Sequence, residues 1–227
     1  MGKMSKLFSG KIKFFNPVQE KVFHLFAADK IISQSFYFTG GTALAAVYLH
    51  HRQSEDLDFF SSQEFDNELV FTLINQIASL IKTKSHFTQT GNARIFEFLD
   101  GEELVIKLDF AYYPHQRLKL GKKIDDIEVD SLIDIAANKL VTIIQRTEIK
   151  DFIDLYFLLK KYTMWDLIYA AEKKFEVEID IVLLGSDFLK VEQFDFLPKM
   201  IKPLKLATLK NFYINQAKKI AKKVVEY

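Results

Sequence analysis

The chain has 227 residues, enough for one large domain or two small ones with a well-formed hydrophobic core. Its formal net charge of +1 argues against a protein that binds nucleic acid through bulk electrostatics alone. Cysteine is absent, which excludes disulfides and thiolate zinc sites, and no apolar run approaches the roughly 18 residues of a membrane span, so we expect a cytoplasmic protein that does not enter a membrane.

The first 110 residues alternate between helical and strand patterns. Apolar residues at helical spacing predict three helices, over residues 17–34, 42–51 and 64–84. Short runs rich in aromatic and β-branched residues predict five strands, at 36–38, 57–60, 86–90, 94–99 and 104–110. The last three strands form a meander, because Gly91-Asn92 and Asp100-Gly101 between them are strong hairpin signals.

The pattern changes at Ser131, after a stretch rich in proline, glycine and lysine. Five further helices are predicted, over residues 131–146, 148–162, 164–175, 179–190 and 204–225. We therefore predict an α+β fold: a mixed-sheet core over residues 1–120, followed by a helical C-terminal region over residues 121–227 that packs on it. The last helix is rich in lysine, which is most often a solvated face; contact with RNA or an acidic partner is the minority interpretation.

Two aspartates on the second strand point the same way. Asp56 and Asp58 are two residues apart, so their side chains share one face while Leu57 and Phe59 point into the core. Neighbouring carboxylates repel, and a hard divalent ion such as Mg²⁺ relieves that repulsion and accepts oxygen ligands. An Asp-x-Asp pair alone is weak evidence for a metal, since acidic residues beside aromatics are also common at a strand edge.

A diglycine, Gly40-Gly41, ends the first strand and opens the next helix together with Thr42. Free backbone N–H groups and the helix dipole favour an anion at such a position, and glycine lets a phosphate approach the backbone closely. Thr42 would add a hydroxyl hydrogen bond. The alternative is a tight strand–helix turn with Thr42 as an ordinary N-cap, and taken alone this alternative is the stronger one.

A third carboxylate lies on the strand at 104–110, where Lys107 and Asp109 share a face. If this strand lies beside the strand of Asp56 and Asp58, three carboxylates would surround two metal ions. Phosphoryl transfer needs such metals to neutralise a triphosphate, orient the attacking hydroxyl and stabilise the departing pyrophosphate. The alternative is that Asp109 ends its strand and leads into a turn.

The helical half contains a second charged block. Lys139 and Arg146 are seven residues apart and lie on one face of an apolar helix. Buried basic residues need an anionic partner, either a carboxylate cluster or a triphosphate. A competing interpretation pairs Arg146 with Asp151 across the helix break and Lys150 with Asp154 at i,i+4.

Two adjacent histidines, His50 and His51, stand at the end of the helix at 42–51. No His-x-x-x-His or His-x-x-Glu spacing supplies a metal site around them. We therefore expect them to interact with the helix dipole at its C-terminal end.

A strand ending in Gly-Gly-Thr, a helix, a strand with Asp-x-Asp and a later strand with a single Asp resemble the DNA polymerase β-like nucleotidyltransferase superfamily. More narrowly, GGTAL…HRQSEDLDFF followed by DIAANKLVTIIQRTEIKDFIDLYFLL resembles the AbiEii/AbiGii toxin family of bacterial nucleotidyltransferases. The resemblance spans residues 36 to 160, and the flanking segments lie outside the recognisable motifs.

The resemblance implies roles for the motif residues of the core. Gly40–Thr42 would hold the triphosphate of an incoming NTP. Asp56 and Asp58 would bind two Mg²⁺ ions. Asp109 would hold the catalytic metal and help to orient or deprotonate the acceptor hydroxyl.

The resemblance also implies roles outside these three strands. Lys139 would contact the nucleotide phosphates, and Asp151 matches the downstream acidic site residue of the family. Arg52 and Ser54 stand where the family has Arg and Ser, and would brace the carboxylates or the phosphates.

The implied activity is transfer of an NMP group from an NTP to an acceptor with release of pyrophosphate, by the toxin of a toxin–antitoxin or phage-defence system. RNA such as tRNA is the favoured acceptor, and a cognate antitoxin is an expected partner. Two alternatives stay open: the same chemistry on a small molecule or a protein hydroxyl, and an inactive nucleotide-binding module. The intact glycines and aspartates argue against the inactive module.

Overall fold

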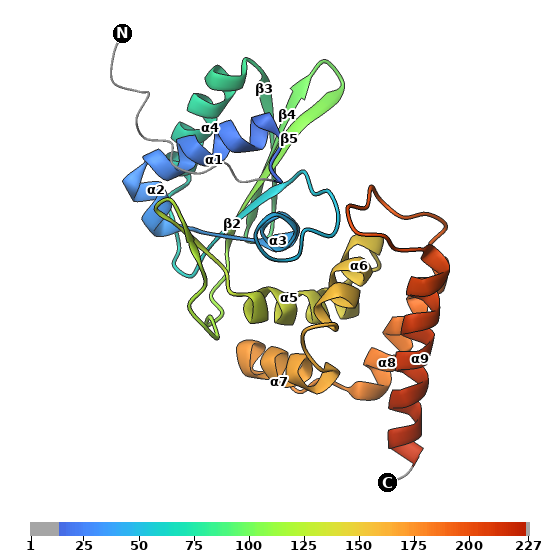
Figure 1. Cartoon of the computed structure of the whole chain (residues 1–227). Coiled ribbons are helices and arrows are strands. Elements are labelled where there is room, and N and C mark those ends of the chain that lie inside the picture. Colours follow the sequence, from blue (N-terminus) through green and yellow to red (C-terminus); the bar gives the residue numbers. More distant parts are fainter. Residues whose placement is uncertain (1–13, 226–227) are drawn as a thin grey trace. The chain divides into compact units, whose positions relative to one another are not determined.

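A computed structural model describes residues 14–225, and the chain divides into two compact units (Figure 1). The first unit takes the residues up to Tyr48 together with Ser54–His115 and Leu120–Asp130. The second unit takes Leu49–Gln53, Gln116–Lys119 and the residues from Ser131 onward. The continuous part of the second unit thus begins at Ser131, whereas we drew the boundary after residue 120.

The first unit is built on a mixed sheet, whose strand order in the described residues is β3-β4-β5-β2-β1-β7-β6. The strands are β1 Tyr37–Thr39, β2 Leu57–Ser61, β3 Lys84–Thr90, β4 Ala93–Asp100, β5 Glu103–Tyr112, β6 Lys123–Ile124 and β7 Ile127–Val129. The pairs β1/β7 and β2/β5 are parallel, and the other pairs are antiparallel. The α+β class, the mixed sheet and the five predicted strands are confirmed, whereas β6 and β7 were missed because two or three residues are too few to show alternation.

Three helices of this unit accompany the sheet: α1 Pro17–Ala28, α2 Lys30–Ser35 and α4 Asn67–Ile81. The helix predicted over residues 17–34 is in fact two, because Asp29 has an extended backbone and caps the start of α2 with its side chain. An aromatic core lies against one face of the sheet: Phe26 of α1 stacks on Phe59 of β2 at 3.8 Å between ring centroids, and Phe110 of β5 lies beside them. All three rings are fully buried, so none of them has surface to offer a ligand.

The segment after β1 begins as the short helix α3, Gly40–Ala43, and continues as a π-helix, Leu44–Leu49. It starts two residues before the predicted helix. It ends at His50, whose backbone is left-handed at φ 51°.

The second unit consists of helices, which confirms the predicted helical C-terminal region (Figure 1). They are α5 Leu132–Gln145, α6 Ile149–Leu158, α7 Met164–Phe175, α8 Ile181–Leu189, the 3₁₀ helix Lys190–Gln193 and α9 Leu206–Val225. Ser131 caps α5, and a capping box of Thr163 and Asp166 begins α7. The buried hydroxyl of Tyr213 in α9 donates to the carbonyl of Phe152 in α6 at 2.6 Å, which ties the last helix to this unit.

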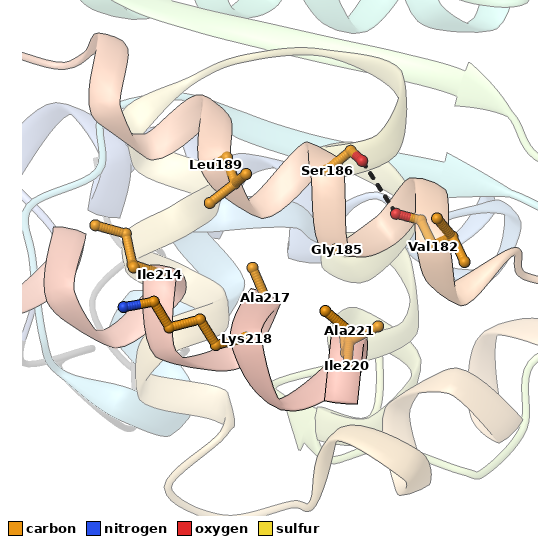
Figure 2. Close-up of a pocket in the computed structure, with 9 residues that line it drawn as sticks. All are labelled: Val182, Gly185, Ser186, Leu189, Ile214, Ala217, Lys218, Ile220 and Ala221. Carbon is orange, nitrogen blue, oxygen red and sulfur yellow. Dashed lines mark hydrogen bonds between the residues drawn. The ribbon is translucent and has the colours of Figure 1, made fainter. Parts of the chain in front are cut away.

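An apolar pocket of about 470 Å³ lies between α8 and α9 (Figure 2). Val182 and Leu189 of α8 face Ile214 and Ile220 of α9 across it, and Lys218 lies at its edge. None of the residues that the sequence assigned to catalysis lines this pocket.

Among the residues that the structure describes, no helix combines the length and the apolar character that crossing a membrane requires.

Candidate active site

The first group of predicted site residues lies in the sheet unit. β2 and β5 are parallel neighbours, and Asp58 pairs in register with Asp109. On its other side Asp58 pairs with Thr39 at the end of β1, immediately before the diglycine. The prediction that the two aspartate strands are adjacent is therefore confirmed, and Asp56 precedes β2 by one residue.

Gly40 packs directly on the Asp58 side chain. Its backbone has φ +72°, and a Cβ built there would lie 1.9 Å from Asp58 Oδ2. Glycine is required for both reasons, since a side chain would be strained by this backbone and would collide with the carboxylate. The backbone of Gly40 therefore lies close to the Asp58 side chain, and this is the close contact that the diglycine permits in the structure.

The segment just before Asp56 is held by side chains from two directions. The hydroxyl of Thr42 donates to Ser54 Oγ at 2.8 Å. The amide of Gln19 in α1 donates to the carbonyls of Ser54 and Glu55 at 2.9 and 3.0 Å. Thr42 is buried inside α3, so the alternative that it serves as the N-cap is wrong, and its observed role is to fix Ser54.

Lys107 lies beside the carboxylates and was not singled out as a site residue from the sequence. Its Nζ is 2.7 Å from Asp109 Oδ2, while the buried Oδ1 of Asp109 has no hydrogen-bond partner. Burial lowers the pKa of Lys107, but Asp109, Asp56 and Asp58 outweigh it and raise this pKa overall. One ammonium thus faces an excess of carboxylate charge.

Burial raises the pKa of Asp109, and the neighbouring charges of Asp56 and Glu97 add to that rise against the opposing effect of Lys107. Among the described residues, no three histidine or acidic side chains converge closely enough to hold a metal ion by themselves. The sheet therefore offers two in-register carboxylates and one unpartnered oxygen rather than a complete protein cage.

The second group of predicted site residues lies in the helical unit, around Asp154 of α6. Arg52 binds this carboxylate with two nitrogens, at 2.6 Å from Nε and 2.8 Å from Nη2. His51 Nε2 is 2.7 Å and Lys139 Nζ 2.8 Å from the same group. Asp154 is fully buried and Arg52 is 2% exposed. Burial raises the pKa of Asp154, but Lys139 and Arg52 outweigh it and hold this pKa well below its usual range.

Asp151 extends this network by one turn of α6. Lys139 Nζ is 2.7 Å from Asp151 Oδ1, and Arg146 Nε is 2.8 Å from Asp151 Oδ2. The predicted pairing of Arg146 with Asp151 is therefore confirmed. The pairing of Lys150 with Asp154 is wrong, because Asp154 points inward to buried cations while Lys150 is exposed. We call Asp154, Asp151, His51, Arg52, Lys139 and Arg146 together the Asp154 cluster.

The segment His51–Gln53 is also fixed to the helical unit by its backbone. Gln53 N donates to the carbonyl of Lys199, and the N–H groups of Ile201 and Lys202 donate to the carbonyl of His51. The prediction for His51 was wrong: it is buried against Asp154 and does not cap a helix dipole. The available signal was an aspartate on an apolar face of α6, since such a residue needs buried cations.

Comparisons with known proteins identify the family. A family model described as "Nucleotidyl transferase AbiEii toxin, Type IV TA system" matches residues 24–220. The chain belongs to the AbiEii family. The resemblance found in the sequence is therefore confirmed, and the match extends beyond the motifs at both ends. As an AbiEii protein the chain is a nucleotidyltransferase of a toxin family, and nucleotidyltransferases generally use an NTP and a divalent metal.

Individual proteins are also similar to this chain. This AbiEii protein is 39% identical over 149 residues to the uncharacterized protein aq_aa25 of Aquifex aeolicus (strain VF5), covering 62% of this chain and 67% of the relative. JHP933 of Helicobacter pylori has a similar crystal structure, with a TM-score of 0.56, 23% identity and coverage of 91% and 92% of the two chains. The nucleotidyltransferase toxin MenT4 of Mycobacterium tuberculosis H37Rv gives a TM-score of 0.50, with 16% identity and coverage of 90% and 86%. The two structural matches show a shared fold.

Proposed function

We propose that this AbiEii protein transfers an NMP group from a magnesium-bound NTP to an RNA acceptor, with tRNA favoured, and releases pyrophosphate. The observation that carries the proposal is the in-register pair of Asp58 and Asp109 on parallel strands, with a buried Asp109 oxygen that has no hydrogen-bond partner. Mg²⁺ in phosphoryl-transfer sites is usually held by one or two carboxylates together with substrate phosphates and water. The two in-register carboxylates of the sheet fit that mode of binding.

The carboxylates and Lys107 have different roles at the site where the NTP would react. We assign Asp56, Asp58 and Asp109 to two Mg²⁺ ions. When bound, Mg²⁺ would neutralise the triphosphate and stabilise the departing pyrophosphate. We also propose that Asp109 orients or deprotonates the acceptor hydroxyl, as the family resemblance implies. Lys107 orients Asp109 through their 2.7 Å contact.

The start of α3 supports the triphosphate assignment. Backbone N–H groups at a helix start have no partner within the helix, and here they follow β1, whose last residue pairs with Asp58. We propose that Gly40, Gly41 and Thr42 bind the phosphates there, and that Ser54 braces Thr42.

We propose a positioning role for Arg52, Lys139 and Asp151, and for Lys139 this role replaces the phosphate contact that the resemblance implied. Each has an anionic or cationic partner within the Asp154 cluster, and removing one charge from such a buried network leaves another uncompensated. Arg52 lies four residues before Asp56 in the chain, so a fixed Arg52 limits where the aspartate segment can go.

The family description supports a partner as well as a substrate. We propose that this protein acts as the toxin of a two-component system, with a cognate antitoxin that counteracts it.

The test is a labelling assay with Mg²⁺, each of the four α-³²P NTPs and total tRNA. Wild-type protein should label RNA, whereas Asp58→Asn and Asp109→Asn should lose about a hundredfold or more of the rate, since a metal contributes several kcal/mol of transition-state stabilisation. Asp100→Asn, at the exposed end of β4, is the matched control and should label RNA normally.

The same assay separates the alternatives. Label on protein or a small molecule, lost in Asp58→Asn, would retain the chemistry and reject RNA as acceptor. Full activity in both Asp58→Asn and Asp109→Asn would reject the assigned site. Absence of transfer to any acceptor would favour the inactive nucleotide-binding module.

A further inference from the structure

The sheet face that carries Asp58 and Asp109 also carries aromatic side chains. Phe60 is two residues from Asp58 on β2, and Tyr113 is four residues from Asp109, just after β5, so alternation puts both rings on the carboxylate face. The N–H of Tyr113 donates to the carbonyl of Ser61 at 2.7 Å, which continues the β2/β5 pairing up to this residue.

The rings contact one another. The centroids of Phe60 and Tyr113 are 4.9 Å apart with 36° between the ring planes. Tyr113 in turn meets His115 edge-on at 4.7 Å. These contacts confirm that the rings lie on one side of the sheet, and we call Phe60, Tyr113 and His115 the aromatic platform.

The platform differs from the aromatic core on the opposite face. There Phe59 and Phe110 have no exposed surface and are covered by Phe26 of α1. Phe60 and Tyr113 are only partly buried, although large rings gain free energy when they leave water. Both rings therefore have exposed surface to offer a ligand.

The position of the platform matches the chemistry of a nucleotide. Phe60 lies two positions after Asp58 on the strand, a rise of about 7 Å. A nucleotide carries its charged phosphates at one end and a flat, aromatic base at the other, with the ribose between. Bases of every kind stack on aromatic side chains, because each presents a π-face.

We propose that Phe60 and Tyr113 form a stacking site for a nucleobase, next to the carboxylates that hold the metals. The inference rests on the proposed function and deepens it by locating the base. The base belongs either to the incoming NTP or to the terminal nucleotide of the acceptor, and both present the same surface to the rings.

Binding measurements with paired ligands test the proposal. Affinities of the magnesium complexes of the four NTPs and of inorganic tripolyphosphate would be measured for wild type, Phe60→Leu, Tyr113→Leu and Tyr113→Phe. Stacking on one aromatic contributes about 5- to 150-fold in affinity. We expect the Leu variants to lose that factor for NTPs and none for tripolyphosphate, while Tyr113→Phe keeps wild-type affinity.

A matched control comes from the other face of the sheet. Phe71 of α4 is 37% exposed and contacts Phe87 and Phe96, so Phe71→Leu removes a comparable ring away from the carboxylates. This variant should bind NTPs and tripolyphosphate like wild type. Urea unfolding of each variant checks that the fold is intact.

A fluorescence readout reports stacking directly. The sequence has a single tryptophan, Trp165, which lies in the helical unit. In a Trp165→Phe background, Tyr113→Trp would place the only indole on the platform. Its emission should be quenched by a magnesium–NTP complex and unaffected by magnesium tripolyphosphate.

The outcomes are distinct. Unchanged NTP affinity with a raised KM for tRNA in the Leu variants would support stacking and assign the base to the acceptor. Unchanged affinity and unchanged KM, or an equal loss for tripolyphosphate and NTP, would overturn the platform. Failure of wild-type protein to bind either magnesium complex would instead overturn the proposed function.

Discussion

At the scale of single residues, the carboxylate site depends on one close contact. Gly40 lies against Asp58 with no room for a Cβ, and its left-handed backbone would strain other residues for a separate reason. The glycine therefore fixes where the Asp58 carboxylate points, in addition to any contact with a phosphate. Sequence patterns suggested a phosphate contact or a tight strand–helix turn but not the contact with Asp58, because the pairing of β1 with β2 that brings Asp58 to Gly40 is not visible in local spacing.

Gly40→Ala should damage both stability and activity. A left-handed backbone costs a non-glycine residue about 1–2 kcal/mol, and the new Cβ must also displace Asp58. Gly91→Ala is the matched control, since Gly91 has φ +55° with no atom near the Cβ position. Urea unfolding should show a loss for both variants, larger for Gly40→Ala, and transfer activity should fall for Gly40→Ala alone. Equal activities would mean that the Gly40 contact does not position Asp58.

At the scale of elements, regular residue patterns predicted the longer helices and strands. They did not predict the short strands β6 and β7 or the π-helix. Alternation on the strands of Asp58 and Asp109 predicted which face each carboxylate takes, and hairpin glycines predicted the meander. The contact of Arg52 with Asp154 joins residues 102 positions apart, and no local pattern pairs them. The π-helix after Ala43 has no distinct periodicity in six residues, so it was predicted as an ordinary helix.

Helix α8 contains a glycine that its surroundings do not require. Gly185 lies inside the helix, and a Cβ there would meet Ile220 of α9 at 3.4 Å, an ordinary van der Waals distance. Gly185→Ala should stabilise the protein by about 0.5–1 kcal/mol, because alanine loses less backbone entropy on folding. The midpoint of urea unfolding should rise at an unchanged slope. A lower midpoint would show that α8 and α9 cannot accept the methyl group.

At the scale of the whole molecule, two short segments, Leu49–Gln53 and Gln116–Lys119, belong to a different unit from their neighbours, and the first carries part of the Asp154 cluster. Leu49–Gln53 groups with the helical unit, while the residues before and after it group with the sheet. Its attachment is the Asp154 cluster together with the backbone bonds from residues 199 to 202. The boundary predicted after residue 120 does not separate such short segments from their neighbours, because a division made along the sequence treats each unit as one continuous stretch.

The Asp154 cluster should make the stability of the whole protein depend on pH through His51. Burial lowers the pKa of His51; the contact with Asp154 opposes this, while Arg52 and Lys139 add to it. The folded protein therefore resists a proton that the unfolded chain accepts below the ordinary histidine pKa of about 6.5. The free energy of unfolding should be insensitive to His51 above that pH and should fall as the pH decreases below it, by up to about 1.4 kcal/mol per pH unit.

His51→Gln tests this dependence, since glutamine can still donate to Asp154 but does not titrate. Urea unfolding between pH 7.5 and 5, a range chosen around the ordinary histidine pKa of about 6.5, should give a flatter profile for this variant than for wild type. His86→Gln, on the exposed strand β3, should keep the wild-type profile. Asp154 contributes in a separate window: its lowered pKa stabilises the fold above about pH 4, and that contribution is lost as the pH falls further. Parallel profiles for wild type and His51→Gln would show that His51 titrates alike in the folded and unfolded chains, and would contradict its burial as a neutral imidazole.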